Sequence, residues 1–101
     1  MRLIDETAWN ADDETPGQVA MLIETPGLQA GLWRTGGVTW DPFDVNVEQN
    51  ETIYVLSGSG QLQVNDQPAI QLSPGITLTI PAGSATRWTV DQDFSEVWIY
   101  H

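Results

Sequence analysis

The chain has no cysteine, no lysine and a single histidine, His101. The lack of cysteine excludes disulfides, thiolate metal sites and a cysteine nucleophile. No run of about 18 apolar residues is present, so no membrane-spanning helix is expected. The first ten residues, MRLIDETAWN, contain no apolar segment of the kind that a secretory signal needs. We therefore expect a cytoplasmic protein.

Positive charge is scarce as well. Three arginines, Arg2, Arg34 and Arg87, stand against 14 acidic residues, and the formal net charge is -11. Such a chain repels phosphate backbones and anionic lipid headgroups, so neither nucleic acid nor a membrane is an expected partner. Because acids cluster at the start, we interpret residues 1–20 as a solvated acidic leader and residues 21–101 as one domain. An acidic arm that binds a partner is the alternative for the leader.

The chain does contain turn residues at regular intervals. Clusters of Gly, Pro, Asn and Asp recur roughly every 8 to 12 residues, a spacing typical of an all-β sandwich or barrel. Pro42 lies inside the third expected strand, which we therefore expect at an edge or broken. The segments between the turns are rich in Val, Ile, Leu, Thr, Trp and Tyr, and they predict strands over residues 18–24, 28–34, 38–47, 51–57, 61–64, 69–72, 76–80, 86–90 and 95–100.

Two spacings carry a resemblance to a known family. The segment ETIYVLSG places Glu51 and Gly58 in an E-x6-G pattern, and GITLTIPAG places Gly75, Pro81 and Gly83 in a G-x5-P-x-G pattern. Together they resemble the two motifs of the cupin superfamily. The further series GLWRTGG, VTW, ETIYVLSG and PAG is similar to small cupins related to ureidoglycine aminohydrolase domains and ethanolamine-utilisation proteins. This resemblance implies an all-β double-stranded β-helix, or jelly-roll, barrel.

The resemblance also implies where a cupin would hold its metal with three histidines and one carboxylate. Asp44 and Asn46 occupy the first two histidine positions, Glu51 keeps the carboxylate, and Thr86 occupies the third histidine position. Imidazole is the donor that such metals prefer, so we predict neither a transition-metal centre nor another cofactor. Asp44, Asn46 and Glu51 could hold a hard divalent cation weakly, or they line a water-filled barrel mouth.

Glu51 is the most informative of these side chains. Its parity with Ile53 and Val55 directs it inward, where an isolated carboxylate either takes up a proton or meets a cation. Arg34 and Arg87 are the candidate partners. Glu51 is then either a polar anchor for a ligand or half of a structural ion pair.

An unusual number of aromatic residues completes the candidate site. Trp88 shares the parity of Thr86 and is expected to wall a pocket, although core filling is the alternative for most tryptophans. The predicted ligand-binding residues are Arg34, Asp44, Asn46, Glu51, Thr86, Arg87 and Trp88.

These residues favour a cupin that binds a small polar metabolite without the usual three-histidine centre. One alternative is an enzyme of carbon–nitrogen or carbohydrate metabolism that uses Glu51 as an acid or base, with a weakly bound divalent metal. Another is a structural dimerisation module. The fold alone does not choose among them.

The strands over residues 51–57 and 95–100 are apolar on both faces. We expect Tyr54 and Leu56 to face outward, together with Trp98 and Tyr100, as an exposed cluster. This predicts a homodimer. Alternatively, residues 1–20 cover the cluster within one chain.

Overall fold

Ten strands and one short 3-10 helix form the chain in the computed structural model, which describes residues 2–12 and 15–101. The acids Asp13 and Glu14 of the expected leader lie outside the described residues. In chain order the elements are η1 (Glu6–Ala8), β1 (Asn10–Ala11), β2 (Gln18–Thr25), β3 (Leu28–Arg34), β4 (Phe43–Asn46), β5 (Glu51–Ser57), β6 (Gly60–Val64), β7 (Ile70–Leu72), β8 (Thr77–Ile80), β9 (Ala85–Val90) and β10 (Ser95–Tyr100).

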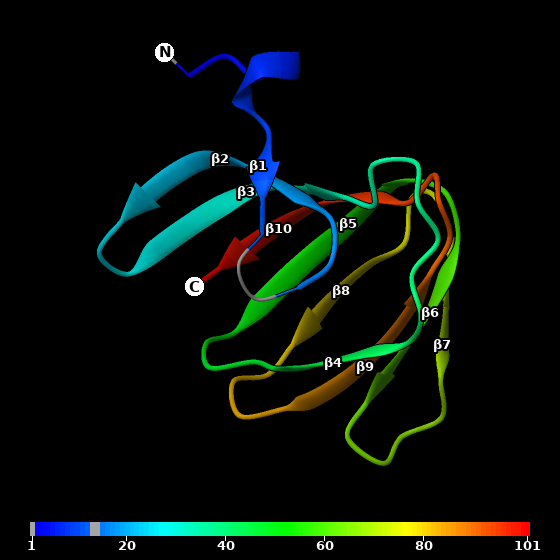
Figure 1. The fold of residues 1–101 in the computed structure, drawn as a ribbon. Coiled ribbons are helices and arrows are strands. Elements are labelled where there is room, and N and C mark those ends of the chain that lie inside the picture. The colour runs from blue at the N-terminus through cyan, green and yellow to red at the C-terminus, as the bar shows by residue number, and fades with distance from the viewer. Residues whose placement is uncertain (1, 13–14) are drawn as a thin grey trace.

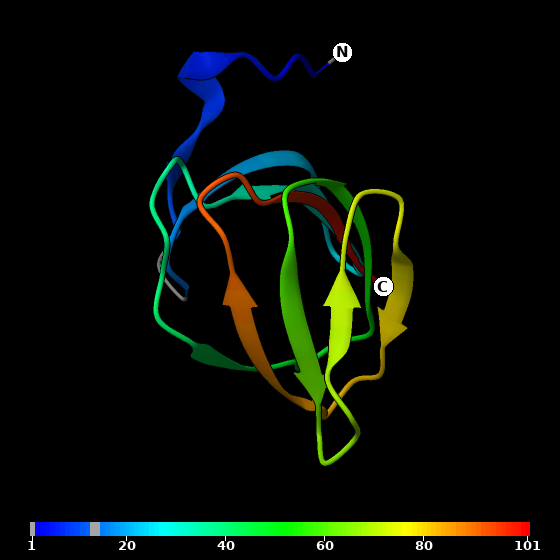
Figure 2. The same ribbon diagram turned by 90° about the vertical axis from the view of Figure 1, so that its right-hand side faces the viewer.

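The strands form two sheets that face each other across a shared interior (Figures 1 and 2). The six-stranded sheet has the order β1-β2-β3-β10-β5-β8, and the four-stranded sheet has the order β4-β9-β6-β7. Every strand pair is antiparallel. The all-β, two-sheet architecture predicted from the turn spacing is confirmed. No helix in the described ranges is long and apolar enough to cross a membrane.

The expected strands agree with the structure except in one segment. Residues 38–47 were expected as one strand, but only Phe43–Asn46 pairs with a neighbour. Pro42, directly before it, has no N–H to donate and so ends the pairing. The remaining eight expected strands agree within one residue at each end.

Part of the expected leader pairs with the large sheet. β1 pairs with β2 through Asn10↔Val19 and Ala11↔Gln18. β2 itself begins at Gln18 and ends at Thr25, so it runs across the boundary expected between residues 20 and 21. The start of the chain therefore extends the edge of the sheet.

The centre of the molecule is packed with aliphatic and aromatic side chains from both sheets. In β9, for example, Thr86, Trp88 and Val90 are buried and the residues between them are exposed. Fully buried apolar side chains are close-packed, which favours a single arrangement of the two sheets. The largest fully buried side chains are Phe94, Ile53, Leu62, Leu72, Ile80 and Val55.

Two glycines are required by close contacts. Gly31 lies opposite Trp98, and a Cβ at Gly31 would lie 2.8 Å from the indole and 2.7 Å from the Ala20 carbonyl oxygen. Gly58 has a φ of 78°, and a Cβ there would lie 2.6 Å from the backbone of Phe94. Glycine alone avoids both the clash and the backbone strain at Gly58. The E-x6-G spacing therefore reflects a tight turn directly after β5.

Candidate ligand-binding site

A cavity of about 410 Å³ opens between the two sheets. Its volume lies within the range of about 300 to 1,000 Å³ that small-molecule sites occupy. Most of the wall comes from the inner face of the six-stranded sheet, and β4 and β9 close the other side. The cavity is lined by Ala11, Asp12, Thr15, Val19, Met21, Glu24, Gln29, Trp33, Phe43, Val45, Glu51, Trp88, Glu96, Trp98 and Tyr100.

Glu51 lies in the wall of this cavity at the start of β5. It pairs with Tyr100 on one side and with Ile80 on the other, and its side chain faces inward with Ile53 and Val55, as parity predicts. Only 7% of the residue is exposed. Burial penalises the charged carboxylate and raises the pKa of Glu51 to about 7. The group is therefore able to gain or lose a proton near neutral pH.

A second acid, Glu96, lines the same cavity and was missed in the sequence analysis. It is 5% exposed, and within the described residues its Oε2 atom has no hydrogen-bond partner. Burial, and secondarily the charge of Glu51, raise the pKa of Glu96 well above its ordinary value. The sequence feature that could have placed Glu96 in the cavity is its position on the same face of the strand as Trp98 and Tyr100. Because residues 95–100 are apolar on both faces, however, the sequence does not show which face points inward.

Trp88 stacks within an ordered aromatic wall. Its ring lies parallel to Phe43, with ring centroids 6.5 Å apart and an interplanar angle of 6°. The indole Nε1 donates to Thr86 Oγ1 at 2.9 Å, and Thr86 Oγ1 donates to the Val45 carbonyl at 2.7 Å. Thr86 is not part of the cavity lining; its hydroxyl helps to fix the orientation of the Trp88 ring.

Two further tryptophans complete the wall. Trp33 lies 6.0 Å from Phe43 between ring centroids, and its Nε1 donates to Thr15 Oγ1 at 3.1 Å. Trp98 packs against Tyr100 at 4.9 Å. Trp98 and Tyr100 were expected in an outward cluster, but both line the cavity because the inner face of β10 begins at Glu96.

Asp44 and Asn46 point away from the cavity, contrary to the sequence-based expectation. Side chains alternate along β4, and Phe43 and Val45 are the residues that face inward. The alignment to the cupin motif was therefore out of register by one residue. Asp44 instead forms an ion pair with Arg87 at 3.2 Å, with the two side chains 70% and 54% exposed.

The interior does not fit the three-histidine metal centre of cupins. The inward positions of β4 are apolar, Thr86 uses its hydroxyl within the wall, and His101 is an exposed residue that hydrogen-bonds Thr52. Among residues 2–12 and 15–101, no group of three or more His, Cys, Asp or Glu side chains could hold a metal ion. The proposed weak site of Asp44, Asn46 and Glu51 does not form, because only Glu51 faces the cavity.

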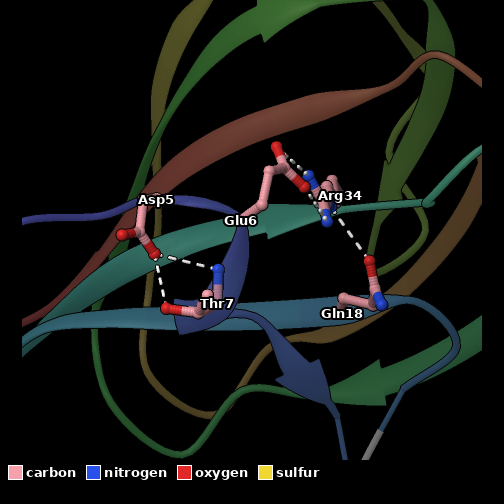
Figure 3. Close-up of polar contacts among 5 residues, drawn as sticks. All are labelled: Asp5, Glu6, Thr7, Gln18 and Arg34. Carbon is pink, nitrogen blue, oxygen red and sulfur yellow. Dashed lines mark hydrogen bonds and ion pairs between the residues drawn. The ribbon is translucent and has the colours of Figure 1, made fainter.

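Arg34 is not among the residues that line the cavity. Figure 3 shows it beside Glu6 and Gln18. Its Nε donates to Gln18 Oε1 at 2.9 Å, its Nη2 pairs with Glu6 at 3.3 Å, and its guanidinium lies 4.0 Å from the centroid of the Trp9 ring. Arg34 thereby ties the segment before β1 to the end of β3. The expectation that Arg34 or Arg87 pairs with Glu51 is wrong, because both arginines are engaged elsewhere.

Comparison with known proteins identifies one family. The EutQ-like cupin domain matches residues 27–96. A protein assigned as ethanolamine utilization protein Q from Salmonella typhimurium is 17% identical, with a TM-score of 0.75 over 97% of this chain and 83% of that chain. EutQ of Clostridium difficile is 22% identical, with a TM-score of 0.66 over 81% of this chain and 60% of that chain.

The same fold occurs in HppE, a protein with a different name from the two EutQ proteins. The iron(II) form of HppE is 15% identical, with a TM-score of 0.80 over 100% of this chain and 59% of that chain. At this level of identity the likeness extends to the fold alone. No curated protein matches the chain.

Proposed function

The chain belongs to the EutQ-like cupin family, and we propose that it binds a small polar molecule in the cavity between its sheets, with Glu51 as anchor and Trp88 as wall. The supporting observation is the buried carboxyl of Glu51 in a cavity of about 410 Å³. Burying an ionisable group costs stability, and such groups gather at functional sites. A ligand that meets Glu51 offsets this cost.

The rest of the wall has the chemistry of a small-molecule site. Three tryptophans and Phe43 supply apolar surface, and a few polar groups converge on it, which is the usual composition of ligand pockets. The ring of Trp88 is held by Phe43 and Thr86 before any ligand arrives. Such a preformed wall reduces the entropic cost of binding.

The proposal is tested by thermal-shift screening with amines, ureides, sugars and carboxylates. A ligand present at about 100 times its Kd should raise the Tm by about 10 °C. Glu51→Gln and Trp88→Ala should each reduce this shift, whereas Arg87→Gln, on the outer face of the four-stranded sheet, should not. Stabilisation that survives both cavity substitutions would place the binding site elsewhere.

A second candidate function is acid–base catalysis by Glu51 on the bound molecule. It is favoured by the pKa of about 7, since a general acid or base works best when its pKa is close to the ambient pH. The substrate would belong to carbon–nitrogen or carbohydrate metabolism. Glu51→Gln should then lower kcat about 100-fold or more while binding weakens much less. A loss of affinity with kcat unchanged would leave Glu51 as an anchor only.

A further inference from the structure

We propose that the cavity selects a small organic cation that carries N–H donors, with Glu96 as a second anchor facing the ligand alongside Glu51. This inference rests on the proposed function and names the chemical class of its ligand. Glu96 is independent of the cupin motifs, since it lies on β10 and not at a motif position.

The first argument is the state of Glu96. It is almost entirely buried, it lines the cavity, and its Oε2 has no hydrogen-bond partner among the described residues. A buried acceptor without a donor is costly, and native proteins rarely keep one without a reason. A donor that enters the cavity with the ligand removes this cost.

The second argument is the charge of the lining. Four of its residues are acidic, namely Asp12, Glu24, Glu51 and Glu96. No Lys, Arg or His lines the cavity in the part of the chain that the structure describes. An anionic ligand would meet like charge without a compensating cation. A cationic ligand would supply a counter-charge to Glu51 and Glu96.

The third argument is the aromatic wall. Trp33, Trp88 and Trp98 all line the cavity, and tryptophan is the side chain whose ring face attracts cations most strongly. Desolvation within a cavity increases this attraction. Carboxylates and indoles thus favour the same ligand, one with a compact positive charge. The unpartnered oxygen of Glu96 further favours an ammonium or guanidinium over a quaternary ammonium.

A neutral polar ligand is the competing possibility. Both acids hold a proton readily, so the free cavity can remain neutral and donate hydrogen bonds to a sugar or an amide. Cation binding at Glu51 and Glu96 differs in one measurable respect: it favours their ionised forms and so releases a proton. The titratable groups that face the cavity are Asp12, Glu24, Glu51, Glu96 and Tyr100.

The test compares three probes that share a benzyl group on the full chain by isothermal titration calorimetry. Benzylammonium carries charge and N–H donors, benzyltrimethylammonium carries charge alone, and benzyl alcohol carries neither charge nor N–H. We expect benzylammonium to bind at least about tenfold more tightly than benzyl alcohol, with benzyltrimethylammonium between them. At pH 6, in buffers of different ionisation enthalpy, benzylammonium should release close to about one proton and benzyl alcohol none.

Two variants assign the effect to its residue. Glu96→Gln should weaken benzylammonium about tenfold or more and leave benzyl alcohol within about threefold. The matched control is Glu48→Gln, which makes the same change at an exposed acid outside the lining and should leave both probes unchanged. The proton release of the unsubstituted chain supports or contradicts the inference even if Glu96→Gln does not fold.

The outcomes separate this inference from the proposed function. If benzyl alcohol binds as tightly as benzylammonium and no proton is released, the proposed preference for a cationic ligand is wrong. The cavity would then be a site for neutral ligands. Selectivity for benzylammonium that persists in Glu96→Gln overturns the role of Glu96. Failure of all three probes and of the thermal-shift screen overturns both proposals.

Discussion

The two sheets of the barrel distribute their side chains differently. In β6 and β9 of the four-stranded sheet the alternation is regular: Leu62 and Val90 face the core, while Gln61 and Gln63 face outward. These strands need no ligand or partner to explain their side chains, because the apolar face packs on the core and the polar face meets solvent.

The six-stranded sheet departs from this pattern on both faces. Glu51 and Glu96 are buried on the inner face, whereas Tyr54 and Leu56 on the outer face are 46% and 45% exposed. Burying acids and exposing apolar groups both cost stability. The four-stranded sheet therefore mainly holds the fold together, and the six-stranded sheet carries the features that call for a functional explanation.

The largest effect should come from the packed side of the interior. Leu62 is fully buried, and Leu62→Ala should lower the free energy of unfolding by about 3 to 4 kcal/mol through lost contacts and a new cavity. Met21, on β2, already borders the ligand cavity, so Met21→Ala should cost less than about 2 kcal/mol. Urea denaturation measures both. Equal losses would show that the two sheets share one uniform core.

The next effect concerns the acids of the six-stranded sheet. The unfolded chain releases the proton of Glu51 near pH 4.5, whereas the native state keeps it up to a pH of about 7. The native state therefore binds more protons in this window, and the free energy of unfolding falls as the pH rises through it. The loss attributable to Glu51 should be about 3 kcal/mol, from the rise in its pKa from 4.5 to about 7.

Other acids of this negatively charged chain contribute to the same trend, and Glu96 acts in the same direction. The difference between the unsubstituted chain and Glu51→Gln isolates the share of Glu51. Thermal unfolding from pH 4 to pH 8 should show a shallower decline for the variant. Parallel curves would mean that the pKa of Glu51 is the same in the native and unfolded states. The burial of Glu51 would then not distinguish the six-stranded sheet electrostatically from the four-stranded sheet.

The sequence predicted the strands well because turn residues and alternation are local signals. β3, β5 and β10 match the expected bounds, and Gly58 has the tight-turn conformation that its motif implies. The inward direction of Glu51 was also predictable, since Ile53 and Val55 share its parity. Local periodicity was sufficient for these features.

The partners of Glu51 were not predictable in the same way. Asp44 and Asn46 were misplaced because a shift of one residue in register moves every side chain of a strand to the opposite face. Glu96 was overlooked because both faces of β10 are apolar. Which face turns inward depends on pairing with β3 and β5, and this long-range information is absent from the local pattern.

A smaller effect is expected on the outer face of the six-stranded sheet, where we propose that two copies of the chain associate. The outward positions of β5 and β10 are Thr52, Tyr54 and Leu56, and Ser95, Val97 and Ile99, with no acid among them. For a chain of charge -11, an acid-free apolar face is where two copies repel each other least. The segment before β1 contacts Arg34 and leaves Tyr54 and Leu56 exposed.

Light scattering should therefore find a homodimer, and Leu56→Glu should weaken it at least about tenfold by placing a charge in the contact. Gln61→Glu is the matched control, since it adds the same charge to the exposed outer face of the four-stranded sheet and should leave the dimer intact. An unsubstituted chain that stays monomeric at high micromolar concentration would contradict the proposal. The apolar outer face would then have no role in self-association.

The smallest effect is expected for the ion pair on the outer face of the four-stranded sheet. Asp44 and Arg87 are both more than half exposed, and exposed pairs of this kind contribute about 0.2 to 1 kcal/mol. A double-mutant cycle with Asp44→Asn and Arg87→Gln should give a coupling within that range, and it should decrease at high salt. Neither substitution should alter ligand binding, because neither side chain faces the cavity. Impaired ligand binding in both variants would show that Asp44 and Arg87 contribute to the site. If Leu62→Ala were still as destabilising as expected, the four-stranded sheet would then both hold the fold together and take part in function.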